Sequence, residues 1–269
     1  MSRPIGGTFT PHEAVAPKDA ATVILLRDGD RGLEVFLVRR VGAMAFAGGM
    51  TVFPGGGVDP QDDDPDVQWS GPAPQWWADR LGTDEPRARR LVCAAARETF
   101  EECGVLLAGR AAAAVVADTR ALDADRRALE AHELTFSAFL RREQLVLAAD
   151  RLRPWSHWIT PVGESRRYDT RFFVAALPEG QQADGATSEA EEVSWATPAD
   201  ALAQWREGRF MLLPPTWAQL EMLVGFADVA AVMAARPAIA PVQPVLVQVA
   251  ERWRVEFDGA ERYYADLPR

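Results

Sequence analysis

Histidine, cysteine and lysine are scarce in this chain, and their scarcity excludes several kinds of site. The 269 residues include three histidines, two cysteines and a single lysine. The histidines show no ligand spacing, so we expect no zinc site. Cys93 and Cys103 lie on one predicted helix, about 15 Å apart along its axis, whereas a disulfide requires Cα atoms within about 7 Å. We therefore expect two unpaired thiols on a buried helix face, in a reducing compartment.

Long apolar runs and positive charge are also lacking. No apolar stretch reaches the roughly 18 residues of a membrane-spanning helix, and residues 1–21 lack the apolar segment of a signal peptide. We therefore expect no membrane partner and a cytoplasmic location. The net charge of −10 disfavours binding of polyanions through counterion release, so no nucleic-acid partner is expected. Nearly all positive charge is arginine, which suits bidentate contacts with single phosphate groups.

The chain does contain an unusual concentration of acid on one predicted helix. Glu98, Glu101 and Glu102 are spaced so that their side chains fall within an arc of about 100°. Like charges at these spacings repel each other, and only Arg97 offsets them from the same stretch. The opposite face carries residues that suit packing on a sheet, namely Val92, Ala96, Thr99, Phe100 and Cys103. The pattern predicts an amphipathic helix over 86–103. Its acidic face is either completed by a cation or is an ordinary solvated surface.

Strand-like and helix-like segments alternate along the chain, which indicates an α/β layered domain. We expect strands at 22–26, 33–38, 50–53, 157–160, 171–177, 192–196 and 245–249. We expect helices at 86–103, in two pieces within 123–150, at 198–207 and at 215–235. Pro86 and Gly104 suit the first turn and the C-terminus of the first helix. Residues 59–83 show no clear period and have the character of an inserted loop, with a short helix near Trp76.

Two separated segments together resemble the Nudix box, Gly-x5-Glu-x7-Arg-Glu-U-x-Glu-Glu-x-Gly-U, in which U is aliphatic. The second half of the pattern is matched by Arg97, Glu98, Glu101, Glu102, Gly104 and Val105, with Thr99 at an aliphatic position. Gly56 matches the first glycine, and Asp62 stands where the pattern has its first glutamate. Arg97 follows Gly56 by 41 positions instead of 14, so 27 residues are inserted within the box.

The interrupted box resembles the subgroup of this family that is related to the peroxisomal coenzyme A diphosphatases, in which Phe-Pro-Gly-Gly precedes an expanded loop. Here that motif is residues 53–56, and segments 46–50 and 167–173 support the resemblance. It implies a Nudix α/β/α sandwich with a mixed central sheet, a helical insertion and a C-terminal extension. The implied divisions are an irregular arm at 1–19, a Nudix hydrolase domain at 20–210 with an insertion at 59–85 and a helical segment at 120–150, and a C-terminal helix and tail at 211–269 packed on the same domain.

The resemblance also implies an activity. It indicates a hydrolase that requires Mg²⁺ or Mn²⁺ and cleaves the diphosphate linkage of a nucleoside diphosphate joined to another group. The preferred substrate is coenzyme A or an acyl-CoA, giving 3′,5′-ADP and a phosphopantetheine. Nucleotide sugars, NADH and dinucleotides are the alternative substrates. A non-catalytic Nudix-fold module that binds a ligand or regulates is the alternative of another class, and a homodimer is the implied assembly.

The resemblance assigns roles to individual residues. The metal ligands are Glu98, Glu101 and Glu102, and the catalytic residues are Glu98, Glu101 and Arg97, the arginine orienting a glutamate. The substrate-binding residues are Gly55, Gly56, Arg40, Arg167 and Arg171, with surface ion pairing as the alternative for the last two. A further ligand or base is expected from Glu189, Glu191 or Glu192, for which a solvated strand edge is the alternative. For Trp69, Trp76 and Trp77 we favour core or dimer packing over stacking on an adenine.

Overall fold

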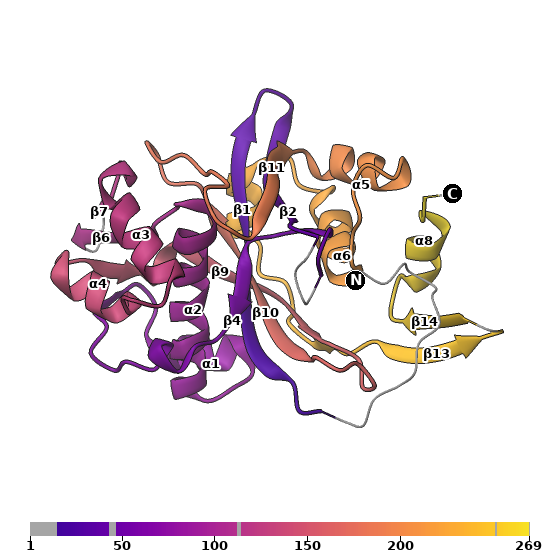
Figure 1. Cartoon of the computed structure of the whole chain (residues 1–269), viewed down its shortest axis with the longest axis horizontal. Helices are drawn as coiled ribbons and strands as arrows, with labels where there is room; N and C mark the ends of the chain where they lie inside the picture. The colour runs from indigo at the N-terminus through magenta and orange to yellow at the C-terminus, as the bar shows by residue number, and fades with distance from the viewer. Residues whose placement is uncertain (1–14, 43–46, 112–113, 251, 269) are drawn as a thin grey trace.

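The computed structural model describes residues 15–42, 47–111, 114–250 and 252–268. Most of the predicted N-terminal arm (residues 1–14) and position 46 of the 46–50 segment lie outside the described residues. The centre of the molecule is a mixed sheet with helices on both sides (Figure 1). This arrangement confirms the predicted α/β class.

The main sheet has the strand order β11-β2-β1-β10-β9-β12, with β3 paired to β2 and β4 paired to β1. Strand β1 runs parallel to β10 and antiparallel to β2, so the sheet is mixed. The bounds are β1 Lys18–Gly29, β2 Gly32–Arg40, β3 Thr51–Val52, β4 Gly55–Gly57, β9 Leu152–Ile159, β10 Tyr168–Ala176, β11 Ala190–Ala196 and β12 Pro241–Val242. Each strand predicted between positions 22 and 196 overlaps one of these strands.

Helix α2 (Glu85–Cys103) confirms the predicted helix, and local signals set both of its ends. The carboxylate of Asp84 accepts a hydrogen bond from the Arg87 amide at 2.8 Å, which satisfies one free donor of the first turn. Pro86 occupies that turn. Gly104 ends the helix at φ 69°, a left-handed conformation that costs glycine little.

The apolar face of α2 is packed against the main sheet. Phe100 and Ala96 are fully buried in a core shared with strands β1 and β2. Thr99, which departs from the aliphatic pattern, is tolerated because its hydroxyl donates to the Ala95 carbonyl at 2.7 Å. Cys93 and Cys103 are buried and unpaired as expected, and burial raises the pKa of the Cys93 thiol to about 12.

The insertion is structured and pairs with a later part of the chain. Its short strand β5 pairs with β8, and β5, β8, β6 and β7 form a second sheet in that order. The bounds are η1 Pro60–Asp62, β5 Trp69–Ser70, α1 Pro74–Leu81, β6 Ala108–Ala111, β7 Ala114–Val115, η2 Arg120–Leu122, α3 Asp123–Glu130, α4 Phe136–Arg142, β8 Val146–Ala148 and η3 Ala149–Arg151. The predicted helix near Trp76 is therefore confirmed, whereas the loop-like remainder contributes to a sheet. Trp77 is fully buried, which confirms its core role.

A second core covers the other face of the main sheet. Helices α5 and α6 lie on the opposite side from α2 (Figure 1), and they bring Trp205 and Trp217 into contact with Tyr263. The bounds are α5 Pro198–Arg206, α6 Pro214–Leu223, α7 Val229–Ala234, β13 Val245–Val249, β14 Arg252–Glu256 and α8 Ala260–Ala265. The single helix predicted over 215–235 is wrong, because Asp228 caps a separate helix by accepting from the Ala231 amide at 2.7 Å.

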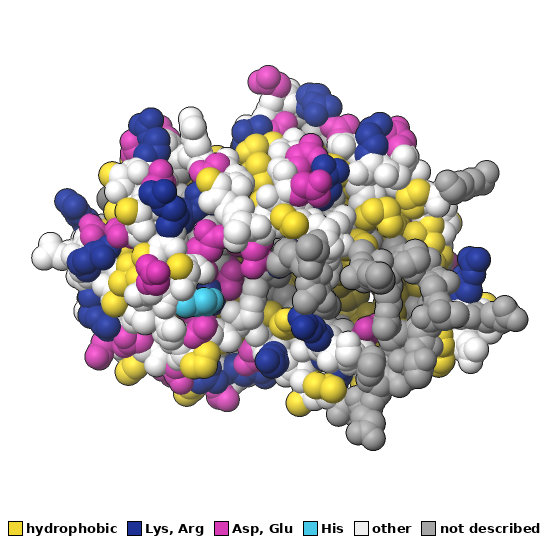
Figure 2. Space-filling model, in the orientation of Figure 1, with side chains coloured by type: hydrophobic (Ala, Val, Ile, Leu, Met, Phe, Trp, Pro, Cys, Tyr) yellow, Lys and Arg dark blue, Asp and Glu magenta, His cyan; other side chains and the backbone are white. Residues whose placement is uncertain are grey.

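Two further observations concern the whole chain. Within the described residues, no helix combines the length and apolarity needed to cross a bilayer. Acidic and basic side chains are interspersed over the visible surface, with acidic groups gathered near the middle of the face (Figure 2). The predicted division into arm, domain and tail stays a prediction.

Candidate active site

The glycine turn, which comprises residues 55–57, lies directly against the end of α2 that carries the glutamates. Strand β4 pairs with β1 and carries Gly55 and Gly56 across the helix. A Cβ atom on Gly56 would stand 2.5 Å from a carboxylate oxygen of Glu98, and one on Gly55, at φ 152°, would collide with the Ala21 carbonyl. Only glycine therefore allows strand β1, the turn and the helix to approach so closely.

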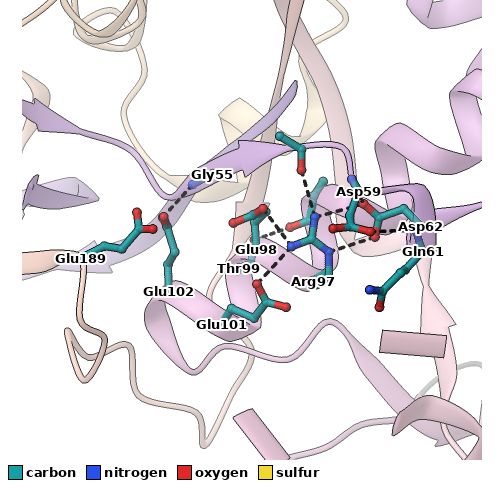
Figure 3. Close-up of polar contacts among 12 residues, drawn as sticks. Gly55, Asp59, Gln61, Asp62, Arg97, Glu98, Thr99, Glu101, Glu102 and Glu189 are labelled. Carbon is teal, nitrogen blue, oxygen red and sulfur yellow. Dashed lines mark hydrogen bonds and ion pairs between the residues drawn. The ribbon is translucent and has the colours of Figure 1, made fainter. Parts of the chain in front are cut away.

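Arg97 is held between Asp62 and two of the glutamates (Figure 3). Its Nε and Nη2 donate to the two carboxylate oxygens of Asp62 at 2.9 and 3.0 Å. Its Nη1 donates to Glu98 at 2.9 Å and to Glu101 at 3.0 Å. Burial alone would lower the pKa of Arg97, but the hydrogen bonds that it donates to Asp62 and the charges of Glu98 and Asp62 raise it. The arginine thus remains cationic and orients both glutamates.

Asp62 reaches Arg97 because a short helical turn holds it. The Asp59 amide donates to the Asp62 carboxylate at 2.8 Å, and the Asp59 carboxylate accepts from the Gln61 amide at 2.8 Å. This reciprocal cap with Pro60 in the first turn was a signal in the sequence that could have placed Asp62. Asp62 is 4% exposed, so its pairing with Arg97 is internal.

The acidic face, defined as Glu98, Glu101 and Glu102, carries more negative charge than its surroundings neutralise. Glu102 accepts a hydrogen bond from the Gly55 amide at 2.8 Å. Burial raises the pKa of Glu102, and the charge of Glu98 raises it further. Burial also raises the pKa of Glu98, where the charge of Arg97 opposes the shift and the charge of Glu101 adds to it. A cation bound at this face would relieve the repulsion between these carboxylates.

A fourth carboxylate, Glu189, approaches the acidic face from the segment before β11. Its carboxylate lies beside that of Glu102 (Figure 3) and pairs with Arg40 at 2.5 Å. The charge of Arg40 lowers the pKa of Glu102, and the charge of Glu189 raises it, so both groups act on this glutamate. The structure thus brings together two predicted site residues, Arg40 from β2 and Glu189 from the turn before β11.

Glu191 and Glu192 have a different partner. They contact Arg39 at 3.6 and 2.7 Å. Side chains alternate between the two faces of a strand, and Leu37 belongs to the core on the side of α5 while Val38 belongs to the core on the side of α2. Arg39 therefore points away from α2, and Glu189 is the one of the three candidates that meets the acidic face.

Arg167 and Arg171 are buried and make internal bonds. Arg167 donates to the carbonyls of Thr160 and Pro161 at 3.0 and 3.1 Å. Arg171 is 2% exposed and donates to the Leu81 carbonyl at 3.3 Å. These contacts join the two arginines to other parts of the fold than the acidic face, and their role in binding substrate stays a prediction.

Arg171 belongs to a second polar cluster, which we call the Asp169 cluster: Asp19, Arg87, His157, Asp169 and Arg171. Asp169 accepts from His157 at 2.6 Å and from Arg87 at 2.9 Å, and it also pairs with Arg171. Arg87 in turn donates through Nε to both carboxylate oxygens of Asp19 at 3.0 Å. No sequence signal linked these residues, because they come from β1, α2, β9 and β10.

The donor chemistry of the acidic face fits a hard divalent cation. Within the described part of the chain, no three acidic, histidine or cysteine side chains converge into a ready-made metal cage. Mg²⁺ usually takes only one or two protein carboxylates and keeps several of its waters. The buried, mutually repelling Glu98 and Glu102 meet that requirement.

Comparisons with known proteins show which proteins this chain is similar to. A family model described as the NUDT19 Nudix domain matches residues 72–223. The chain is similar to the acyl-coenzyme A diphosphatase NUDT19 of Xenopus laevis, with 26% identity over 231 residues, covering 73% of this chain and 61% of the relative. It is 29% identical over 211 residues to putative nudix hydrolase 7 of Caenorhabditis elegans, covering 78% of this chain and 62% of the relative.

The chain spans about three fifths of the length of these curated relatives. Among solved structures, the chain is similar to a NUDIX hydrolase from Alicyclobacillus acidocaldarius. That likeness has a TM-score of 0.66 and 25% identity, and it covers 83% of this chain and 98% of the other.

Proposed function

The chain belongs to the NUDT19 Nudix domain family, and on this premise we propose that it is a metal-dependent diphosphatase. Its substrate is a nucleoside diphosphate linked to another group, preferably coenzyme A or an acyl-CoA. The products are then 3′,5′-ADP and a phosphopantetheine or its acyl derivative. The name of the Xenopus laevis relative, an acyl-coenzyme A diphosphatase, supports this choice of substrate.

The observation that carries the proposal is the excess negative charge of the acidic face beside the glycine turn. Glu98 and Glu102 hold Mg²⁺ or Mn²⁺ with the help of Glu101, and Arg97 orients Glu98 and Glu101 through bonds of 2.9 and 3.0 Å. The bound ion neutralises phosphate oxygens and activates water. Glu189 adds a carboxylate that serves as a further ligand or takes the proton of the attacking water.

The remaining parts of the proposal concern substrate contacts and assembly. Gly55, Gly56 and Arg40 line the approach to the acidic face and contact the substrate, and Arg167 and Arg171 stay proposed contacts of its more distant groups. The enzyme acts as a homodimer in the cytoplasm, with a small-molecule partner and neither nucleic acid nor membrane. Unpaired cysteines support the cytoplasmic location, and the net charge of −10 supports the absence of a nucleic-acid partner. The homodimer rests on the family resemblance.

The test is a product assay with purified protein and Mg²⁺ or Mn²⁺. The substrates are coenzyme A, an acyl-CoA, ADP-ribose, NADH and a diadenosine polyphosphate, and chromatography identifies the products. We expect 3′,5′-ADP from coenzyme A or the acyl-CoA, and loss of turnover when a chelator removes the metal. Folded protein that turns over none of these substrates would contradict the proposal, and preference for another one would change the substrate.

A further inference from the structure

Helix α3, which lies outside the box, bonds to the loop that carries Glu189. One carboxylate oxygen of Glu130, the last residue of α3, accepts three hydrogen bonds from this loop. The donors are the Thr187 hydroxyl at 2.9 Å, the Ser188 amide at 2.9 Å and the Ser188 hydroxyl at 2.8 Å. Glu189 directly follows Ser188, so the bonds between Ser188 and Glu130 limit where Glu189 can lie.

Arg126, one turn earlier on α3, bonds both to α2 and to the start of the same loop. Its Nε donates to the Glu101 carbonyl at 2.9 Å, and its Nη1 donates to the Asp184 carboxylate at 2.7 Å. Arg126 is 4% exposed. A Cβ atom on Gly104 would stand 2.8 Å from its Nη1, so the glycine that ends α2 also leaves room for this guanidinium.

The loop is therefore fixed at two points before it reaches Glu189. The Asp184 amide donates to the Cys103 carbonyl at 3.1 Å, which anchors the loop start to the end of α2. Beyond the Glu130 contacts, the Glu189 carbonyl accepts from the Val41 amide at 2.9 Å. Each anchor limits where the Glu189 carboxylate can lie relative to Glu102.

We propose that Glu130 and Arg126 are positioning residues that hold Glu189 against the acidic face. This inference rests on the proposed function, because it concerns the geometry of the same site. It assigns to α3 a part in catalysis that the box does not contain. Displacement of a catalytic group by about 1 Å can cost roughly 100-fold in rate. The bonds that Glu130 and Arg126 make to the loop can therefore affect the rate without contacting the substrate.

If Glu130 served only to keep α3 in place, its removal would detach this helix. Helix α3 is attached to the core through Leu129, which is 1% exposed, so the helix remains docked when the Glu130 carboxylate is removed. Glu130 itself is half-buried at the helix end. Its loss should therefore loosen the loop without unfolding the domain.

The direct test is amide hydrogen exchange of the metal-free protein. In Glu130→Ala, we expect the amides of residues 185–189 to exchange about tenfold faster than in the unaltered protein. Glu130→Gln keeps the accepting oxygen and should restore slow exchange. Glu133→Ala, at an exposed position in the turn after α3, is the matched control and should change nothing. Unchanged exchange in Glu130→Ala would overturn the proposal.

Steady-state kinetics on the substrate found in the product assay provide the second readout. We expect Glu130→Ala to lower kcat by about tenfold with little change in KM, and to have no further effect in a Glu189→Ala background. An equal loss in both backgrounds would show that Glu130 acts without Glu189 and would overturn the proposal. If Glu189→Ala leaves no measurable turnover, the exchange rates decide alone. Absence of turnover in the unaltered protein contradicts the proposed function instead.

Discussion

Helix α2 contributes an arginine to each of two polar clusters, Arg87 near its start and Arg97 near its end. In the Asp169 cluster, two aspartates face two arginines and a histidine. At the acidic face, Arg97 is bonded to Asp62, Glu98 and Glu101, while Glu102 lies beside Glu98. Both clusters are largely buried and use the same residue types, but only the first is balanced in charge.

The pKa shifts of Asp169 and Glu102, one carboxylate from each cluster, have opposite signs. Burial would raise the pKa of Asp169, but the hydrogen bond from His157 and the charge of Arg171 hold it below its ordinary value. For Glu102, burial and the charge of Glu98 both raise the pKa. The two clusters therefore differ in charge balance and not in burial or residue type. The balanced Asp169 cluster supports the fold, whereas the excess negative charge of the acidic face suits a cation.

The strongest test of this contrast is Glu102→Gln. The change removes a buried carboxylate that Glu98 repels, so we expect activity to fall by roughly 100-fold or more while the unfolding midpoint in urea stays the same or rises. Glu85→Gln, an exposed glutamate in the first turn of the same helix, is the control and should retain activity. Turnover of Glu102→Gln within about threefold of the unaltered enzyme would contradict the metal role.

Asp62→Asn should affect both activity and stability, because Asp62 is the partner that keeps Arg97 in place. Removing one member of a buried ion pair costs roughly 3–5 kcal/mol, and the remaining amide recovers part of that. We expect about a tenfold loss of kcat from misplaced glutamates, together with a lower urea midpoint. Asp63→Asn, at the exposed neighbouring position, is the control. A stable, fully active Asp62→Asn enzyme would mean that Arg97 needs no such support.

Asp169→Asn should show the opposite profile to Glu102→Gln. The substitution leaves Arg87 and Arg171 without their shared carboxylate, so we expect a loss of roughly 3 kcal/mol in the free energy of unfolding. The kcat per folded molecule should stay within about twofold, because the bonds of this cluster do not reach the acidic face. Urea denaturation and turnover at a temperature where the variant is folded measure the two effects. A large loss of turnover in the folded variant would join the two clusters functionally.

The smallest expected effect is a dependence of stability on pH. The folded-state pKa of Asp169 lies below its ordinary value of about 3.9, so its ionisation stabilises the fold above that pH, and the contribution is lost as pH falls through the folded pKa. We expect the difference in stability between the unaltered protein and Asp169→Asn to shrink below about pH 3.9. Asp118→Asn, at a fully exposed ion pair with Arg120, should show almost no difference. A gap for Asp169→Asn that stays constant down to acidic pH would refute the assigned cause.

Local signals made α2 and its acidic face predictable from the sequence. Pro86, Gly104 and the 3.6-residue spacing lie within one short segment, so the helix and the three glutamates could be located without tertiary contacts. The pairing of Asp62 with Arg97 depends on how β4 folds back against β1, which a local pattern does not contain. The sequence therefore indicated Asp62 as a candidate without a partner.

Short elements and distant contacts account for what was missed. Strands β5 and β7 have two residues each, too few to show a period, and β5 finds its partner β8 more than 70 positions away. Arg126 and Glu130 look like ordinary surface residues of an amphipathic helix in the sequence. Only the fold shows that they face the loop before β11.

The insertion also means that chain continuity is not what joins the two halves of the box. The exposed Pro65 and Asp66 lie between them, while β4 is held by β1 and Asp62 is held by Arg97. We therefore expect a break after Pro65 to leave two pieces with complementary surfaces, because these contacts join the two halves of the box through space. Co-expression of residues 1–65 and 66–269 should yield a co-purifying, active pair, and the peptide between the halves is then free to accept a foreign sequence.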